Sequence, residues 1–146
     1  MHIWALQICQ NKMARFVGNL HGRAHIGNQE ILDLNWLPIE KRVAQLKLHQ
    51  IHKVTYKRAP EYLMQYFQER NVISQHNTRN NSLKYDLPFV KSKSARSTFL
   101  YTSVEEWNKL PSVLRETNNF NSFKNLLRKH LHNVIQKEAN QDFVYY

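Results

Sequence analysis

The chain has little of several residue types that point to particular classes of protein. Its 146 residues include one cysteine, three glycines and four prolines. A single cysteine, Cys9, cannot form an intramolecular disulfide, which excludes a disulfide-stapled secreted scaffold and favours a reducing compartment. So few glycines and prolines argue against a loop-rich or low-complexity chain. At this length we expect one globular domain in which helices dominate.

Acidic residues and long apolar stretches are also scarce. Eleven acidic residues stand against 21 Lys and Arg, which gives a net charge of +10. No apolar stretch reaches the roughly 20 residues of a membrane-spanning helix, and residues 1–8 lack the basic start and cleavage site of a secretory signal. We expect no membrane partner and an intracellular location, in the nucleus or the cytoplasm. The excess of cations favours a phosphate backbone as partner, although a merely basic protein has the same composition.

Hydrophobic periodicity predicts several helices in the first half of the chain. Residues 3–20 gather six apolar side chains into one arc, which predicts an amphipathic helix with that arc in the core. The arc consists of Leu6, Cys9, Met13, Phe16, Val17 and Leu20. Asn28 is placed to cap a short helix over 29–34. Pro38 is placed to open a long helix that runs to about Arg58, and Pro60 to begin a short one.

The predicted long helix carries a face that suits a ligand. Apolar side chains cover more than half of its circumference, so we expect this helix at the centre of the core. Its narrow remaining face mixes cations, hydrogen-bond donors and one aromatic ring. This face consists of Lys41, Arg42, Gln45, His49, His52, Lys53 and Tyr56. It suits a phosphate backbone with a base or sugar stacked on Tyr56, and a solvated helix face explains the same residues without a partner.

The fold class expected from these patterns is mainly α. Residues 1–135 are predicted to form a single helical domain with a long central helix, and 136–146 a frayed tail. Residues 69–97 are predicted to be a loop or ribbon insertion, since 69–82 is polar and rich in asparagine. A small two-stranded β-ribbon could pair 83–87 with 98–101, because both runs alternate or are rich in β-prone residues.

Capping signals predict further helices after the insertion. Ser103 followed by Glu106 has capping-box spacing, and the helix that it opens should end at Pro111. A short helical turn is expected over 112–115, and Asn121 is placed to cap the last helix. That helix carries a basic outer face with Arg128 and Lys129. The side chains predicted to be structural are Trp36, Pro38, Trp107, Leu110 and Phe123.

Candidate chemistry is hard to find. Eight histidines suggest metal binding, and His21 and His25 have the spacing of a helical ligand pair, but Cys9 cannot complete a zinc site convincingly. Nucleotidyl transfer needs clustered carboxylates to hold two divalent ions, and the acids here are scattered. No glycine-rich phosphate loop or nucleophile elbow occurs. We expect a non-enzymatic chain with no metal and no cofactor.

Several short motifs occur in a characteristic order. The most distinctive is Trp-Asn-Lys-Leu-Pro at 107–111. It is preceded by the segment 34–43, which opens on Leu-Asn-Trp-Leu-Pro-Ile. The other segments are 6–15, 59–63, 78–79, 96–97, 114–115 and 123–124. Together they resemble the region after the polymerase domain at the C-terminal end of non-LTR (LINE-type) retrotransposon reverse transcriptases. The resemblance covers nearly the whole chain.

This resemblance implies a mobile-element protein that copies its own RNA into DNA at a nicked chromosomal target. The polymerase's metal-binding Tyr-x-Asp-Asp box and the endonuclease do not occur in these 146 residues, so no catalytic residue is carried over. The expectation is a truncated copy in which Met1 lies inside a former reading frame.

For such a tail we hypothesise scaffolding and binding of RNA or DNA. The candidate binding residues are Arg42, His49, Lys53, Tyr56, Arg128 and Lys129. Two alternatives remain open. In the first, the chain is a helical protein-interaction module that packs on the polymerase part of a longer protein or self-associates. In the second, it is a decayed fragment without function.

Overall fold

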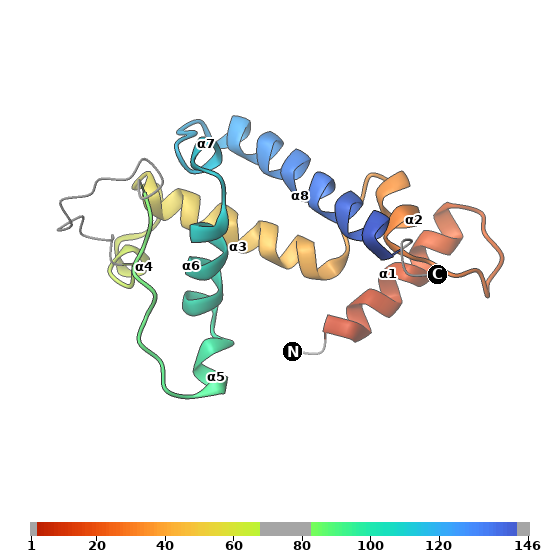
Figure 1. Ribbon diagram of the computed structural model, residues 1–146, viewed down its shortest axis with the longest axis horizontal. Helices are drawn as coiled ribbons and strands as arrows, with labels where there is room; N and C mark the ends of the chain where they lie inside the picture. Colours follow the sequence, from red (N-terminus) through yellow and green to blue (C-terminus); the bar gives the residue numbers. More distant parts are fainter. Residues whose placement is uncertain (1–2, 68–82, 143–146) are drawn as a thin grey trace. The chain divides into compact units, whose positions relative to one another are not determined.

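Figure 1 shows the computed structural model, which describes residues 3–67 and 83–142, with side chains to Glu138. This described part contains eight helices and no strand, which confirms the mainly α fold. The helices are α1 (Ile3–Val17), α2 (Asn28–Asp33), α3 (Ile39–Thr55), α4 (Glu61–Met64), α5 (Lys93–Arg96), α6 (Phe99–Lys109), α7 (Ser112–Arg115) and α8 (Phe120–Asp142). Residues 69–82 of the predicted insertion, and with them the motif at 78–79, lie outside the described residues, whereas 93–96 of the same insertion forms α5.

The chain divides into two compact units. The terminal unit consists of Met1–Val43 and Leu127–Tyr146, and the central unit of Ala44–Leu126. The boundaries fall inside α3 and α8, so each of these two helices contributes one stretch to each unit.

A small hydrophobic cluster lies in the terminal unit. Ala14 of α1, Ile26 in the segment before α2, and Ile31 of α2 are buried together, and Leu34 and Trp36 pack against them. Trp36, which the sequence predicts to be structural, therefore lies at the edge of this cluster.

Helix α1 lies in the terminal unit with its polar side inward. The side-chain amide of Gln10 donates to the carbonyl oxygen of Leu37 at 2.8 Å, and the backbone amide of Ile39 donates to Gln7 Oε1 at 2.9 Å. The prediction that the apolar arc faces the core is wrong, because Phe16 is 81% exposed whereas Ala14 is 1% exposed. Backbone groups of the turn before α3 need polar partners, and glutamine side chains supply them.

A glycine precedes α2 and an acidic residue caps it. The backbone amide of Gly27 donates to Glu30 Oε2 at 2.8 Å, and α2 begins at Asn28. Asn28 is therefore the first helical residue and not the cap that the sequence predicts. The Glu30 carboxylate also lies near the positive end of the helix, where it is favoured.

Helix α3 begins where the sequence predicts and ends earlier. It starts directly after Pro38, whose carbonyl oxygen accepts from the Arg42 amide at 2.9 Å. It ends at Thr55 because Lys57 takes a left-handed conformation, with φ of 54°. An α helix cannot continue through such a residue.

The core of the central unit is aromatic. The imidazole of His52 stacks on Phe123 with ring centroids 4.2 Å apart, and the Trp107 ring lies 5.9 Å from Phe123. His52, Trp107 and Phe123 are all fully buried, and Leu110 is nearly so. The residues that the sequence predicts to be structural in this half of the chain thus lie inside the core.

Helix α6 is capped five residues earlier than predicted, at Thr98 instead of Ser103, and it replaces the ribbon. Thr98 is its N-cap residue and Phe99 its first residue, so 98–101 forms no strand. Ser103 does not cap the helix, because it lies inside α6 and its hydroxyl donates to the Leu100 carbonyl oxygen at 3.2 Å. Val104 and Trp107 repeat at helical spacing on the buried side, and that periodicity overrides the local preference for strand. The helix ends before Pro111, as predicted.

Asn119, and not Asn121, caps helix α8. Its Oδ1 accepts hydrogen bonds from the amides of Asn121 and Ser122, each at 3.0 Å. We expect Asn119→Ala to lower the free energy of unfolding by about 1 kcal/mol, the usual contribution of an N-cap. Asn121→Ala is the matched control, and urea denaturation should show it nearly unchanged. Equal losses for the two variants would contradict this assignment.

Candidate nucleic-acid interface

The predicted ligand-binding face of α3 is largely occupied by internal contacts. Gln45 and His52 are buried, and the His49 ring lies edge-on to Phe120 at 5.6 Å between centroids. Tyr56, directly after α3, donates its hydroxyl proton to the Arg115 carbonyl oxygen at 2.8 Å. The Tyr56 ring is half-buried and lies 4.7 Å from the His52 ring between centroids.

The remaining predicted residues fall into different surroundings. Arg42 is exposed on α3 in the terminal unit. Lys53 lies in the central unit beside Phe120, whereas Arg128 and Lys129 line a pocket of the terminal unit. The structure therefore joins Arg128 with Lys129 and separates both from Lys53 and Tyr56 into another unit.

A cationic cluster surrounds the half-buried ring of Phe120 in the central unit. The Nζ atoms of Lys53 and Lys124 lie 5.4 Å and 5.1 Å from the ring centroid. Both distances are within the range of a cation–π contact. We call Lys53, Phe120 and Lys124 the Phe120 patch.

An arginine borders the segment that leads into the Phe120 patch. Arg58 donates through Nη1 to the Asn118 carbonyl oxygen at 3.0 Å and through Nη2 to Asn118 Oδ1 at 2.9 Å. Asn118 stands two residues before Phe120, so this forked contact fixes the approach to α8. Arg58 also lies over the Tyr56 ring at 5.9 Å. Burial, followed by the negative charge of Glu116, raises the Tyr56 pKa, so this hydroxyl keeps its proton.

A second basic site lies in the terminal unit at α8. Five residues line a pocket of about 310 Å³: Asn35, Arg128, Lys129, His132 and Asn133. Arg128 donates through Nη2 to the carbonyl oxygen of Asn35, which has a left-handed backbone with φ of 58°. None of the five lining residues is acidic. We call this site the Arg128 pocket.

Electrostatics mark the Arg128 pocket as positive. Burial lowers the pKa of His132, and the neighbouring charge of Arg128 lowers it further. Two cationic side chains, an imidazole and two amide side chains line the pocket, and groups of these kinds can donate hydrogen bonds to an anion. A phosphate group is the ligand that this donor set fits chemically.

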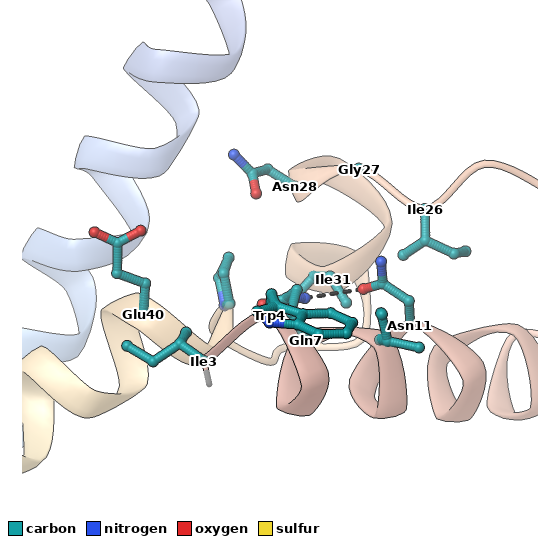
Figure 2. Close-up of a pocket in the computed structure, with 11 residues that line it drawn as sticks. Ile3, Trp4, Gln7, Asn11, Ile26, Gly27, Asn28, Ile31 and Glu40 are labelled. Atoms are coloured by element: carbon teal, nitrogen blue, oxygen red, sulfur yellow. Dashed lines mark hydrogen bonds between the residues drawn. The ribbon is translucent and has the colours of Figure 1, made fainter. Parts of the chain in front are cut away.

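A larger groove in the terminal unit has a different character. It has a volume of about 540 Å³, and Figure 2 shows Ile3, Trp4, Ile26 and Ile31 along it. Gln7 spans part of its floor and donates to Asn11 Oδ1 at 2.9 Å. Its lining is mostly apolar and includes no cation, so the groove is unsuited to a phosphate.

The described residues include neither a group of metal ligands nor a helix that could span a membrane. Nowhere in 3–67 and 83–142 do three or more His, Cys, Asp or Glu side chains gather as a metal site would need. His21 and His25 have ligand-pair spacing but lie outside any helix. No helix in this described part combines the length and apolar character needed to cross a bilayer.

Sequence reasoning missed Phe120 and Lys124. The hydrophobic arc of the last helix begins at Phe123, and nothing in the local pattern says which residue of α3 faces Phe120. The spacing of Phe120 and Lys124, four residues apart on one helix, was the available signal.

Comparisons with protein-family models, with curated proteins and with solved structures give no match. A functional assignment therefore depends on the chemistry of the two basic sites.

Proposed function

We propose that this chain is a non-catalytic nucleic-acid-binding protein that holds RNA or DNA through its phosphates. The observation that carries the proposal is the Arg128 pocket, which Arg128, Lys129 and His132 line together with two amide side chains and without a carboxylate. Arginine suits phosphate because its planar fork can donate two parallel hydrogen bonds. The Asn35 carbonyl oxygen accepts from one end of that fork and orients it.

Net charge supports the same proposal at longer range. A chain with a net charge of +10 attracts polyanions before any specific contact forms. Phosphate contacts of this kind position a nucleic acid but do not read its sequence. We therefore propose binding that tolerates many sequences.

The motif order supports a proposed origin for this function. We propose that the chain derives from the C-terminal region of a LINE-type reverse transcriptase, on the resemblance at 34–43 and 107–111. In that setting a basic tail would hold template RNA or target DNA beside a polymerase. No residue of this chain is assigned a catalytic step.

Salt dependence of binding tests the proposal. If about six phosphates are contacted, the logarithm of the binding constant should fall with the logarithm of salt concentration at a slope of about −4 to −5. Arg128→Gln and Lys129→Gln should each weaken binding and reduce the magnitude of the slope by about 1. Fluorescence anisotropy with labelled RNA and duplex DNA provides the measurement.

An exposed lysine outside the pocket supplies the control. Lys12 lies on α1, and Lys12→Gln should leave both affinity and slope nearly unchanged. Thermal unfolding should show that Lys129→Gln stays within about 0.5 kcal/mol of the parent chain. If neither RNA nor duplex DNA binds at low salt, the proposal fails.

The exposed apolar side of α1 favours a second candidate function, protein interaction. Phe16 is 81% exposed and Met13 55% exposed, and Leu6 and Val17 of the same arc are exposed as well. Exposed apolar patches mark interaction sites when their residues lie together. Light scattering would show association through α1, and Phe16→Glu should reduce it. A monomer at high concentration that binds no hydrophobic dye would count against this candidate.

A further inference from the structure

We infer that the Phe120 patch is a base-stacking site for single-stranded nucleic acid. In this arrangement a nucleobase lies against the Phe120 ring, and the ammonium groups of Lys53 and Lys124 bind the phosphates on either side of it. The inference rests on the proposed function and names the form of nucleic acid that the chain prefers. It also assigns a second contact site, in a different unit from the Arg128 pocket.

The ring of Phe120 is held in a fixed orientation from inside the central unit. His49 lies edge-on to it at 5.6 Å between centroids, and His52 is tilted against it at 5.5 Å. The ring is nevertheless only half-buried. An aromatic ring that packing holds in place at a surface loses little freedom when a base stacks on it, which favours binding.

The two lysines are placed to serve a ligand that has both a base and a phosphate. Their Nζ atoms lie 5.4 Å and 5.1 Å from the ring centroid, one from α3 and one from α8. A lysine side chain is flexible, and its ammonium can move from a ring to a phosphate without moving its helix. Cations from two helices next to one aromatic ring are the combination that single-strand binding proteins use.

A stacked base competes well with the contacts seen without ligand. A lysine ammonium over an exposed aromatic ring changes the equilibrium constant for that contact by only about a few-fold. A base stacked on such a ring raises the binding constant by about five-fold to a hundred-fold. The displaced ammonium also gains a phosphate partner, so it does not become unpaired. The exchange therefore favours the nucleic acid.

Duplexes cannot use the ring in this way. In a double helix both faces of each base are already covered by neighbouring base pairs, whereas bases of a single strand can separate and stack on a protein side chain. The Phe120 patch therefore distinguishes single strands from duplexes, while phosphate contacts at the Arg128 pocket do not.

Oligonucleotides that lack bases test the inference without any change to the protein. Fluorescence anisotropy on the full chain at low salt would compare a 15-mer of thymidine, the same strand with abasic positions, and a 15-base-pair duplex. We expect the intact strand to bind at least about five-fold more tightly than the abasic strand. A uridine 15-mer in parallel separates a preference for RNA from a preference for DNA.

Variants at Phe120 provide the second arm. Phe120→Leu keeps an apolar side chain against His49 and His52 but removes the aromatic face, and it should abolish the difference between intact and abasic strands. Phe120→Tyr should retain the difference. Lys53→Gln should weaken binding of intact and abasic strands alike. Thermal unfolding of each variant checks that it is folded.

The outcomes separate this inference from the proposed function. Equal affinity for intact and abasic strands, or tighter binding of the duplex, would overturn the stacking site while leaving phosphate binding in place. Loss of binding in Arg128→Gln with no effect of Phe120→Leu would do the same. Absence of all nucleic-acid binding would overturn both.

Discussion

Replacing Trp107 with alanine is expected to lower the free energy of unfolding by about 3–5 kcal/mol. The Trp107 side chain is fully buried, and its ring lies 5.9 Å from Phe123 and 6.4 Å from His52 between centroids. Truncating a large ring at such a position removes buried apolar area and leaves a cavity that the surrounding aromatic rings fill only in part.

The tryptophan also holds a segment distant in sequence. Its indole Nε1 donates to the Leu83 carbonyl oxygen at 2.7 Å, and the next residue, Asn108, pairs with Tyr85 through two hydrogen bonds of 2.8 Å and 3.0 Å. Leu83 has a left-handed backbone with φ of 55°, which a leucine adopts at an energetic cost. The Trp107 variant therefore loses packing and also an anchor for this segment.

Two variants separate these contributions. Trp107→Phe keeps an aromatic ring in the core but removes the indole N–H, which leaves the Leu83 carbonyl oxygen without that donor. It should cost less than the alanine variant, with about 0.5–1.5 kcal/mol arising from the lost hydrogen bond. Urea denaturation followed by circular dichroism measures both. An unchanged transition midpoint for Trp107→Ala would show that the ring does not support the fold.

Helix positions could be predicted from the sequence because they depend on local signals. Pro38 and Pro111 mark the start of α3 and the end of α6, since proline restricts which residues can continue a helix. Capping residues were displaced by one to five positions, as at Gly27, Thr98 and Asn119. Several polar residues near each helix start can accept hydrogen bonds from the free backbone amides, and their spacing in the sequence does not decide which of them caps the helix.

Helix orientation could not be predicted from amphipathicity alone. The apolar arc of α1 predicts that this arc is buried. Instead, Gln7, Gln10 and Ala14 lie on the side of α1 that packs against the rest of the terminal unit. Hydrogen bonds to backbone groups near Pro38 decide this orientation, and those groups come from a segment more than 25 residues away in sequence. A buried backbone group without a hydrogen-bond partner destabilises the fold. An exposed apolar side chain costs little when it stands alone, and a cluster of such side chains indicates a binding surface.

For the candidate binding sites, too, residues on one helix could be predicted from local signals, whereas contacts between helices could not. Arg128 and Lys129 were predicted from their place on the outer face of one helix, and the structure places both at a pocket. Tyr56 was selected as the stacking ring because it shares a helix face with Lys53, whereas the half-buried ring beside Lys53 is Phe120. Which aromatic ring meets a given lysine depends on how α3 and α8 pack inside the central unit, and one helix wheel does not contain that information.

Acid is expected to destabilise the central unit through His52. This imidazole is fully buried, and its Nε2–H donates to the Thr117 carbonyl oxygen at 2.8 Å. Burial lowers the pKa of His52, the hydrogen bond to Thr117 opposes that effect, and the charge of Arg58 adds to the lowering. Within the described part of the chain, Nδ1 finds no hydrogen-bond partner, so a proton added there would charge a buried site.

The direction of the pH effect follows from linkage. Above about pH 6.5 the histidine is neutral in both the folded and the unfolded chain, and its contribution to stability is complete. As the pH falls below that value, the unfolded chain takes up a proton before the folded chain does. The free energy of unfolding should then fall by up to about 1.4 kcal/mol per pH unit, until the lowered folded-state pKa is reached.

Urea denaturation between pH 8 and pH 5 measures this slope, and variants assign it. His52→Phe retains a ring against Phe123 but cannot titrate, so its stability should depend less on pH. A smaller slope should remain, because burial also lowers the pKa values of His130 and His132. If His52→Phe kept the full slope, the acid sensitivity would have to arise from other groups, and the buried imidazole would not be its source.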